Sequence, residues 1–188
     1  MDFNTLLSNR RAIRDFRDQE PPLSVIREII QESCLAPTAS NLQPCRFVIV
    51  QNRDFMKRLS DESKRNLVAD IVSNPESPMK QYEDSLRNEG FNVFYNAPCL
   101  VYITGPRGNP TISIDCALTA AYFMFSATAR GLGTCWIALG GDIRDPKTLS
   151  ELGIPKDDRI IAPLIVGYPV AIPSAPERHA PVILEAAV

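Results

Sequence analysis

The apolar residues of this chain fall into two kinds of pattern. Where they recur every three or four positions they predict helices, over residues 3–9, 26–35, 54–72, 115–130 and 145–153. Short runs of β-branched and aromatic residues predict strands, over residues 47–50, 99–104, 134–139 and 159–166. Because helices and strands alternate without a clear break, residues 1–188 are predicted to form one α+β or α/β domain.

Prolines and glycines mark the ends of several predicted elements. Pro37 stops the second helix, and Gly131 follows the fourth helix where a left-handed cap is expected. Asp145 and Pro146 suit the N-cap and the first helical position of the last helix. Pro163 interrupts the last strand, and because proline lacks an N–H group it predicts a bulge or an edge there.

Three segments depart from a regular amphipathic pattern. Residues 73–90 are polar and contain prolines, which predicts a mobile excursion with one helix, a candidate lid. The proline-rich tail that begins at Pro169 cannot fold on itself and is expected to lie across another surface. The helix at 115–130 is almost wholly apolar and should be buried on most sides, while its uncharged stretch, 116–129, is too short to span a bilayer.

The composition is that of an ordinary globular domain. Hydrophobic residues make up 45% and charged residues 22% of the 188 residues, so disorder is not expected. The net charge of −2 gives no reason to expect nucleic acid or an anionic membrane as the main partner. The N-terminus carries Asp2 and no apolar run, so no secretory signal is predicted.

The cysteines favour a reducing, cytoplasmic location over a disulfide framework. They are widely separated, at Cys34, Cys45, Cys99, Cys116 and Cys135. The sequence has no CxxC pair, and the single histidine, His179, cannot complete a zinc site of ordinary ligand spacing. We therefore expect free thiols that pack as small hydrophobic side chains, with no second cysteine placed to resolve a sulfenic acid or to complete a disulfide.

Several common catalytic motifs are missing from the sequence. It contains no GxSxG, no GxxxxGK[ST] and no HExxH, which removes the serine hydrolase, P-loop and zincin interpretations. The Gly131-Leu-Gly133 run lies after a predicted helix and before a predicted strand. A dinucleotide-binding turn needs the reverse order, because the pyrophosphate binds at a helix N-terminus.

An arginine cluster near the N-terminus has two interpretations. Arg10, Arg11 and Arg14 are either solvated surface charges or an anion site, since guanidinium groups offer forked donors suited to phosphate. A helical or turn-like path would bring Arg10 and Arg14 to one side. An extended path would place Arg10, Ala12 and Arg14 on one face, with Arg11 and Ile13 opposite.

A second polar cluster lies between two prolines, at residues 37–44. Its hydroxyl and amide side chains are Thr38, Ser40, Asn41 and Gln43. Such a loop is either a plain polar turn or a site that supplies donors and acceptors to a polyol or a heteroaromatic edge.

Four motifs then occur in the order typical of one known family. They are RRAIRDF at 10–16, APTASNLQP at 36–44, GLGTCW at 131–136 and VGYP at 166–169. Over nearly the whole chain they resemble the nitroreductase family of FMN-dependent oxidoreductases. The resemblance implies one FMN-binding domain, an α+β sandwich with a mainly antiparallel sheet flanked by helices, in an intertwined homodimer. It also implies that residues 53–92 form a variable helical excursion and that the tail at 169–188 wraps the partner subunit.

The resemblance implies FMN-binding roles for the matching residues. Arg10 is expected to bind the phosphate and Arg14 to place a cation near the N1/O2 edge of the flavin, with backbone contacts from Arg11 and Ala12. Arg178 is expected to close on the phosphate. The loop that reaches the flavin, often from the partner subunit, comprises Pro37, Thr38, Ala39, Asn41 and Gln43. The segment under the ring, where a backbone N–H faces N5, comprises Trp136, Ile137, Ala138, Leu139 and Gly140.

The resemblance implies a reductase without a catalytic side chain, since the flavin carries the chemistry and no metal is needed. NAD(P)H would donate a hydride by a ping-pong mechanism, and small nitroaromatics, quinones or similar electrophiles would accept it. Two alternatives stay open: a specialised flavin dehydrogenase or dehalogenase, and a non-catalytic flavin-binding regulatory protein. The sequence departs from the family at Cys45, where tryptophan is common, and His179 is expected to be a surface residue.

Overall fold

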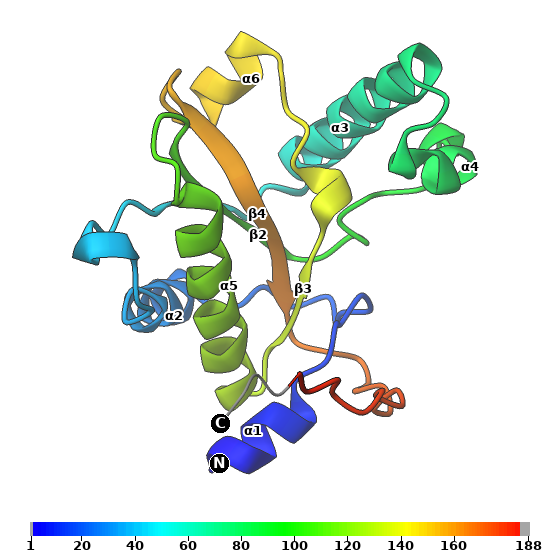
Figure 1. The fold of residues 1–188 in the computed structure, drawn as a ribbon. Helices are drawn as coiled ribbons and strands as arrows, with labels where there is room; N and C mark the ends of the chain where they lie inside the picture. The colour runs from blue at the N-terminus through cyan, green and yellow to red at the C-terminus, as the bar shows by residue number, and fades with distance from the viewer. Residues whose placement is uncertain (1, 185–188) are drawn as a thin grey trace.

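The computed structural model describes residues 2–184 and contains helices packed on a central sheet (Figure 1). The α-helices are α1 (Phe3–Asn9), α2 (Leu23–Ser33), α3 (Arg53–Ser73), α4 (Glu83–Arg87), α5 (Ile112–Ala129) and α6 (Pro146–Glu151). The strands are β1 (Arg46–Val50), β2 (Cys99–Pro106), β3 (Gly133–Trp136) and β4 (Asp158–Gly167). Short 3-10 turns are η1 (Ala39–Asn41), η2 (Pro78–Tyr82) and η3 (Ala138–Gly140).

The four strands form one sheet in the order β1-β2-β4-β3, and every neighbouring pair is antiparallel. The structure therefore confirms the expected α+β class with an antiparallel sheet. Long strands β2 and β4 lie at the centre, and the shorter β1 and β3 lie at the edges.

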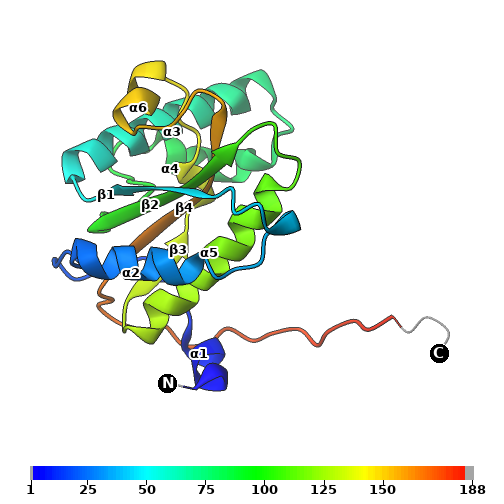
Figure 2. The ribbon, with the colours of Figure 1, turned by 90° about the vertical axis from the view of Figure 1, so that its left-hand side faces the viewer.

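Helices cover both faces of this sheet (Figure 2). Because side chains alternate along a strand, β2 supplies both layers of the core. Leu100 and Tyr102 pack with α3 on one face, whereas Val101 and Ile103 pack with α2 and α5 on the other. All four side chains are fully buried, and burying a side chain of this size contributes about 1.5–3 kcal/mol.

Helix α5 is the most apolar element of the fold. With 18 residues it is long and apolar enough, by length and composition alone, to cross a membrane. The expectation that this stretch is too short came from residues 116–129, but the helix begins earlier, at Ile112. Cys116, Ala120 and Phe123 are fully buried against the sheet. Ile114, Leu118 and Tyr122 are exposed within the described chain, so the prediction that this helix is buried on most sides is wrong for the single chain.

The prediction of a strand over residues 134–139 is wrong beyond Trp136, and Pro163 explains why. Ile137 donates its N–H to the Pro163 carbonyl at 2.8 Å, but Pro163 has no N–H to return to Ile137. The Ile137 carbonyl instead accepts from Gly140 at 2.9 Å, which bends the chain into η3. Pro163 itself lies in the inner strand β4, next to a bulge and not at an edge.

Other predicted helix ends are confirmed by the backbone. Gly131 has φ +75° after α5, the left-handed conformation that glycine adopts without strain. Asp145 accepts a hydrogen bond from the Lys147 N–H at 3.0 Å and Pro146 begins α6. Gly131 thus ends α5 just before β3 begins, whereas Asp145 and Pro146 start α6.

Helix α3 uses buried polar side chains to hold the segment that follows it. Ser60 accepts a hydrogen bond from the Val93 N–H at 3.0 Å, and Lys64 donates to the carbonyls of Asn88 and Phe91 at 2.6 and 2.8 Å. The polar stretch at 73–90 contains one α-helix, α4, as the sequence indicates, together with η2. Residues 88–94 are therefore fixed to the helical layer.

The C-terminal tail leaves the body of the chain, as Figure 2 shows. It is anchored where Arg17 donates its N–H to the Tyr168 carbonyl at 2.8 Å. Beyond this point its apolar side chains are exposed, including Val182 at 88% and Leu184 at 89%. Of the tail predicted over 169–188, the part at 185–188 lies outside the described residues.

Candidate functional site

The arginine segment is an extended stretch of chain that runs beside β3 and forms a single bridge to it. Ile13 donates its N–H to the Thr134 carbonyl at 2.9 Å, and Ala12 forms a parallel bridge with Thr134. Ile13 is buried against Gly133, where a Cβ would lie 2.6 Å from an Ile13 side-chain carbon. The missing side chain of Gly133 therefore allows the segment to approach the strand.

This extended path puts alternate side chains on opposite faces. Arg10, Ala12 and Arg14 line one cavity of about 370 Å³. Arg11 and Ile13 line a separate cavity of about 100 Å³ on the other face. Of the two paths considered for the cluster, the structure adopts the extended one.

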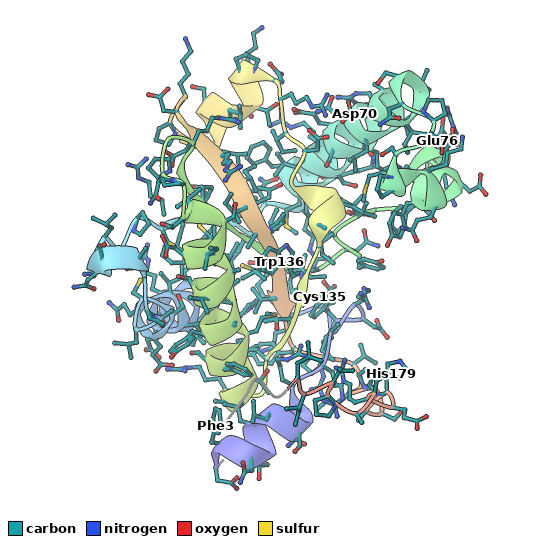
Figure 3. All side chains as sticks on the ribbon, in the orientation of Figure 1. Phe3, Asp70, Glu76, Cys135, Trp136 and His179 are labelled. Carbon is teal, nitrogen blue, oxygen red and sulfur yellow. The ribbon has the colours of Figure 1, made fainter. Side chains whose placement is uncertain are left out.

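The floor of the larger cavity comes from β3 and α5. Cys135 and Trp136 line it from β3, and Figure 3 shows both residues on that strand. The helix contributes the mostly apolar side chains of Ala121, Met124 and Phe125. The result is a partly apolar surface with two guanidinium groups at its rim.

The two cavity-lining arginines are not neutralised. Within residues 2–184, neither the Arg10 nor the Arg14 side chain forms an ion pair or a hydrogen bond. The Arg14 guanidinium carbon lies 5.7 Å from the centre of the Tyr95 ring. The cavity therefore offers uncompensated positive charge to an anion.

Arg11 has a different environment, because it packs on the other side of the segment. Its Nη1 donates to the Arg10 carbonyl at 2.6 Å, which supports the backbone beside the cavity. Its side chain does not line the cavity of Arg10 and Arg14, so only its backbone can contribute there.

The segment after Trp136 is held by two hydrogen bonds from other elements. Ser63 donates to the Leu139 carbonyl at 2.6 Å, and Tyr102 donates to the Gly140 carbonyl at 2.9 Å. Ala138 and Leu139 begin η3, so their N–H groups have no acceptor within that turn. Ile137 is different, because its N–H already donates to Pro163.

Cys135 contributes a neutral group to the cavity. Burial raises the pKa of its thiol, and the nearby guanidinium groups of Arg14 and Arg10 offset this only in part. The lining residues include no histidine, aspartate or glutamate. The cavity thus has cations and apolar surface but no side chain suited to carry a proton near neutral pH.

The polar loop at 37–43 lies away from this cavity in the chain. Ala39 donates its N–H to Asp115 at 2.9 Å, which fixes η1 to the first turn of α5. The arginine cavity meets α5 further along, at residues 121–125. Asn41 and Gln43 have φ of 55° and 47° and their side chains are exposed. One chain therefore does not unite the two predicted halves of the site.

Arg178 is also separate from the cavity. It lies on the exposed tail beside His179, which Figure 3 labels and which is exposed as expected. Another cavity, of about 720 Å³ between α3 and α4, contains none of the predicted site residues. Its rim is charged, with side chains such as Lys57, Arg65 and Arg87.

The expectation that no second cysteine is suitably placed is wrong. The sulfur atoms of Cys45 and Cys116 lie 3.6 Å apart. Cys45 precedes β1 and Cys116 lies in α5, so 71 positions separate them in the sequence. No local pattern could have indicated this contact, because it depends on how α5 packs across the sheet.

Comparison with known proteins now adds to this geometry. The sequence profile of the Nitroreductase family matches residues 7–168. The chain belongs to the nitroreductase family. The match includes the arginine segment, the polar loop and β3, and it ends just before the tail.

Two relatives illustrate the range of this family. The chain is 26% identical to a 4-nitrobenzoate reductase from a Nocardioides species, covering 88% of this chain and 80% of that protein. It is 25% identical to an iodotyrosine deiodinase from Thermotoga neapolitana, covering 87% of each.

Solved structures share the fold. A nitroreductase from Bacteroides fragilis with bound FMN superposes with a TM-score of 0.84 at 21% identity, covering 100% of both chains. An iodotyrosine deiodinase bound to FMN and 3-iodo-L-tyrosine gives a TM-score of 0.75 at 22% identity, covering 97% of this chain and 98% of the other.

Proposed function

We propose that this nitroreductase-family protein is an FMN-dependent oxidoreductase that takes a hydride from NAD(P)H by a ping-pong mechanism. Its acceptors would be nitroaromatics, quinones or similar electrophiles. The observation that supports this most directly is the pair of unneutralised guanidinium groups on a partly apolar cavity beside Trp136. A planar aromatic group that carries a phosphate matches both features of that cavity.

The charge and the apolar surface of the cavity support the following roles for its residues. Arg10 would bind the phosphate, and Arg14 would hold a positive charge near the N1/O2 edge of the ring. When bound, FMN would supply the two-electron chemistry. The chain would supply placement and charge, and Arg14 suits the second role because no carboxylate compensates it within the described residues.

The backbone after Trp136 would complete this surface. Ala138 and Leu139 present N–H groups without acceptors in η3, and either could donate to the edge of a bound ring. Ser63 and Tyr102 hold the carbonyls of this turn, so its N–H groups are kept in place. The turn is therefore preorganised, which favours binding without a rearrangement.

A second copy of the chain would bring the remaining residues to the flavin. Six of the predicted flavin-binding residues lie away from the arginine cavity within one chain: Pro37, Thr38, Ala39, Asn41, Gln43 and Arg178. We therefore propose a homodimer in which the polar loop and the tail of one subunit reach the cavity of the other. The exposed apolar side chains of the tail favour such a contact.

Reductive dehalogenation is a second candidate, and one observation favours it. The iodotyrosine deiodinase relative covers 87% of the chain, a share similar to that of the 4-nitrobenzoate reductase. Since the same fold serves nitro reduction and dehalogenation, the acceptor must be identified by experiment. A flavin-binding protein that turns over no acceptor is the third possibility that the test separates.

The test is an absorption spectrum of the protein after reconstitution with FMN and removal of free flavin. NADPH and NADH are then added without oxygen, followed by a nitroaromatic, a quinone or an iodotyrosine. We expect flavin bands that bleach with a nicotinamide and return with a nitroaromatic or quinone. If the flavin bands return only when iodotyrosine is the added acceptor, the result would favour the dehalogenase. Bands that never bleach with either nicotinamide would favour the specialised enzyme or the regulatory protein over the reductase, and a colourless protein would contradict FMN binding.

A further inference from the structure

Cys45 and Cys116 form a thiol pair outside the proposed flavin cavity. Their sulfur atoms lie 3.6 Å apart, and the Cys116 thiol is also 3.7 Å from the Thr104 carbonyl that accepts from it. Cys116 is fixed within α5, whereas Cys45 directly precedes β1. The two sulfurs need to approach by only about 1.5 Å to reach the disulfide bond length of about 2.05 Å.

The two thiols differ in exposure. Cys116 is fully buried, whereas Cys45 is only half-buried. The Thr119 hydroxyl lies 3.4 Å from the Cys45 sulfur, so this hydroxyl and the Cys116 thiol both lie within hydrogen-bonding reach of that sulfur. A reagent from solvent would therefore meet Cys45 first, with Cys116 directly behind it.

Hydrogen bonding makes the two thiols differ in acidity as well. The contact with Cys116 lowers the pKa of the Cys45 thiol, aided by the Thr119 hydroxyl and opposed by burial and the Asp115 charge. The same contact and burial raise the pKa of Cys116. Cys45 is thus the group with thiolate character, and Cys116 remains a protonated neighbour.

We propose that Cys45 and Cys116 are a redox-active pair that forms a reversible disulfide when Cys45 reacts with a hydroperoxide. The Cys45 thiolate attacks the peroxide, the O–O bond breaks, and the products are a Cys45 sulfenic acid and hydroxide. The Cys116 sulfur then attacks the Cys45 sulfur, and the displaced hydroxyl leaves as water with the Cys116 proton. The proton that Cys45 released on ionising neutralises the hydroxide from the first step. Two thiols and one hydrogen peroxide thus give one disulfide and two waters. A dithiol reverses the step by exchange.

The other cysteines are poorer candidates for this reaction. Burial raises the pKa of Cys99 to about 12 and also raises that of Cys135, so neither thiol forms a thiolate readily. Cys34 is exposed, but partial burial of its sulfur and the charge of Cys45 raise its pKa. Because Cys34 is the exposed thiol, it is the natural competitor and the right control.

The new bond would join the end of the polar loop to α5. Asp115, the residue before Cys116, already binds the Ala39 N–H at 2.9 Å. A disulfide would add a covalent link between the same two parts of the fold. The proposal concerns the thiols alone and holds whether or not the protein binds FMN.

The experiment treats the full-length protein with a small excess of hydrogen peroxide at neutral pH and maps its peptides by mass spectrometry without reduction. We expect a cross-linked peptide pair that contains Cys45 and Cys116, lacks two hydrogen atoms and disappears after dithiothreitol. Cys34→Ser should leave this product unchanged. A Cys34–Cys45 cross-link, or a Cys45 that oxidises to the sulfinic acid without any disulfide, would overturn the proposal.

A second variant tests the order of the two steps. In Cys116→Ser the resolving thiol is absent, so the Cys45 sulfenic acid should persist and be trapped by dimedone. In Cys45→Ser we expect no disulfide and no dimedone adduct at Cys116. Dimedone labelling at Cys116 instead would contradict the assigned roles. If the Cys116→Ser variant fails to fold, the wild-type peptide map still tests the disulfide, and Cys45→Ser still tests which thiol reacts first.

Discussion

Arg10 and Arg14 share a face because the backbone between them is extended and pairs with β3. A helical path would also have brought the two residues together, but it would have left Ala12 off the cavity. The extended path matters chemically because it turns Arg11 away and leaves the Arg10 and Arg14 side chains on one cavity. Each group then has a separate effect that substitution can measure.

We expect Arg14→Ala to weaken FMN binding about tenfold, a cost of about 1.4 kcal/mol, because a charge-assisted contact is lost. The reduction potential of the bound flavin should become more negative, since the reduced ring carries negative charge that Arg14 would stabilise. Equilibrium dialysis and a spectroscopic titration with a redox dye measure the two effects.

Arg107→Ala is the matched control, because Arg107 is an exposed arginine that does not line the arginine cavity. It should leave both the FMN affinity and the potential unchanged. If Arg14→Ala also leaves both unchanged, Arg14 does not contact the flavin edge.

At the scale of elements, Gly133 couples the arginine segment to β3. In Gly133→Ala the new methyl group would lie 2.6 Å from Ile13, so the segment must shift outward. We expect a loss of about 1–3 kcal/mol in the free energy of unfolding, typical of overpacking, and weaker FMN retention because Arg10 and Arg14 move. Gly108→Ala is the control, since its methyl group would meet nothing within 4 Å. Equal losses in the two variants, measured by denaturant unfolding, would contradict this coupling.

The contact between α2 and α5 carries a pH-dependent ion pair. Arg130 donates to both Glu32 oxygens at 2.6 and 2.7 Å, and these bonds together with Ser126 lower the pKa of Glu32 to about 2 from its usual 4.5. A lowered pKa gives stability that is present above about pH 4.5 and is lost as the pH falls toward about 2. Because the Glu32 side chain is 47% exposed, we expect this ion pair to contribute at most about 1 kcal/mol to the free energy of unfolding.

Glu32→Gln should therefore be less stable than wild type at pH 7 and equal to it near pH 2.5, within about 0.3 kcal/mol. The measurement is the free energy of unfolding across this pH range. Glu76→Gln is the control, because Glu76 is exposed and forms no ion pair within residues 2–184. A difference that stays constant with pH would show that the ion pair is not its cause.

The element pattern was largely predictable from sequence because each element carries its own local signals. Asp145 and Pro146 start α6 as expected, and Gly131 caps α5. The end of β3 was not predictable, because it depends on a missing N–H in Pro163, a partner on another strand. The sequence motifs indicated the arginines and the polar loop as site residues, but only packing shows that they lie apart in one chain. The contact of Cys45 with Cys116 was missed for the same reason.

At the scale of the whole molecule, several apolar surfaces have no partner within the described chain. On α5 the side chains of Ile114, Leu118 and Tyr122 are 63%, 38% and 41% exposed, and their spacing of four places them on one face. The tail exposes Val182 and Leu184 as well. Since the predicted flavin-binding residues are also divided between distant parts of the chain, one symmetric dimer would satisfy both observations.

Leu118→Arg tests this dimer, because it places a charge at the centre of the α5 face. We expect wild type to elute as a dimer at micromolar concentration in size-exclusion chromatography with light scattering, and the variant as a monomer. The variant should also lose FMN on desalting, since the polar loop of the second subunit is no longer present. Ser150→Arg adds the same charge to an exposed position on α6 and should remain a dimer that retains FMN. A monomeric wild type that retains FMN would show instead that one chain suffices, and the loop at 37–43 would then have no role at the flavin.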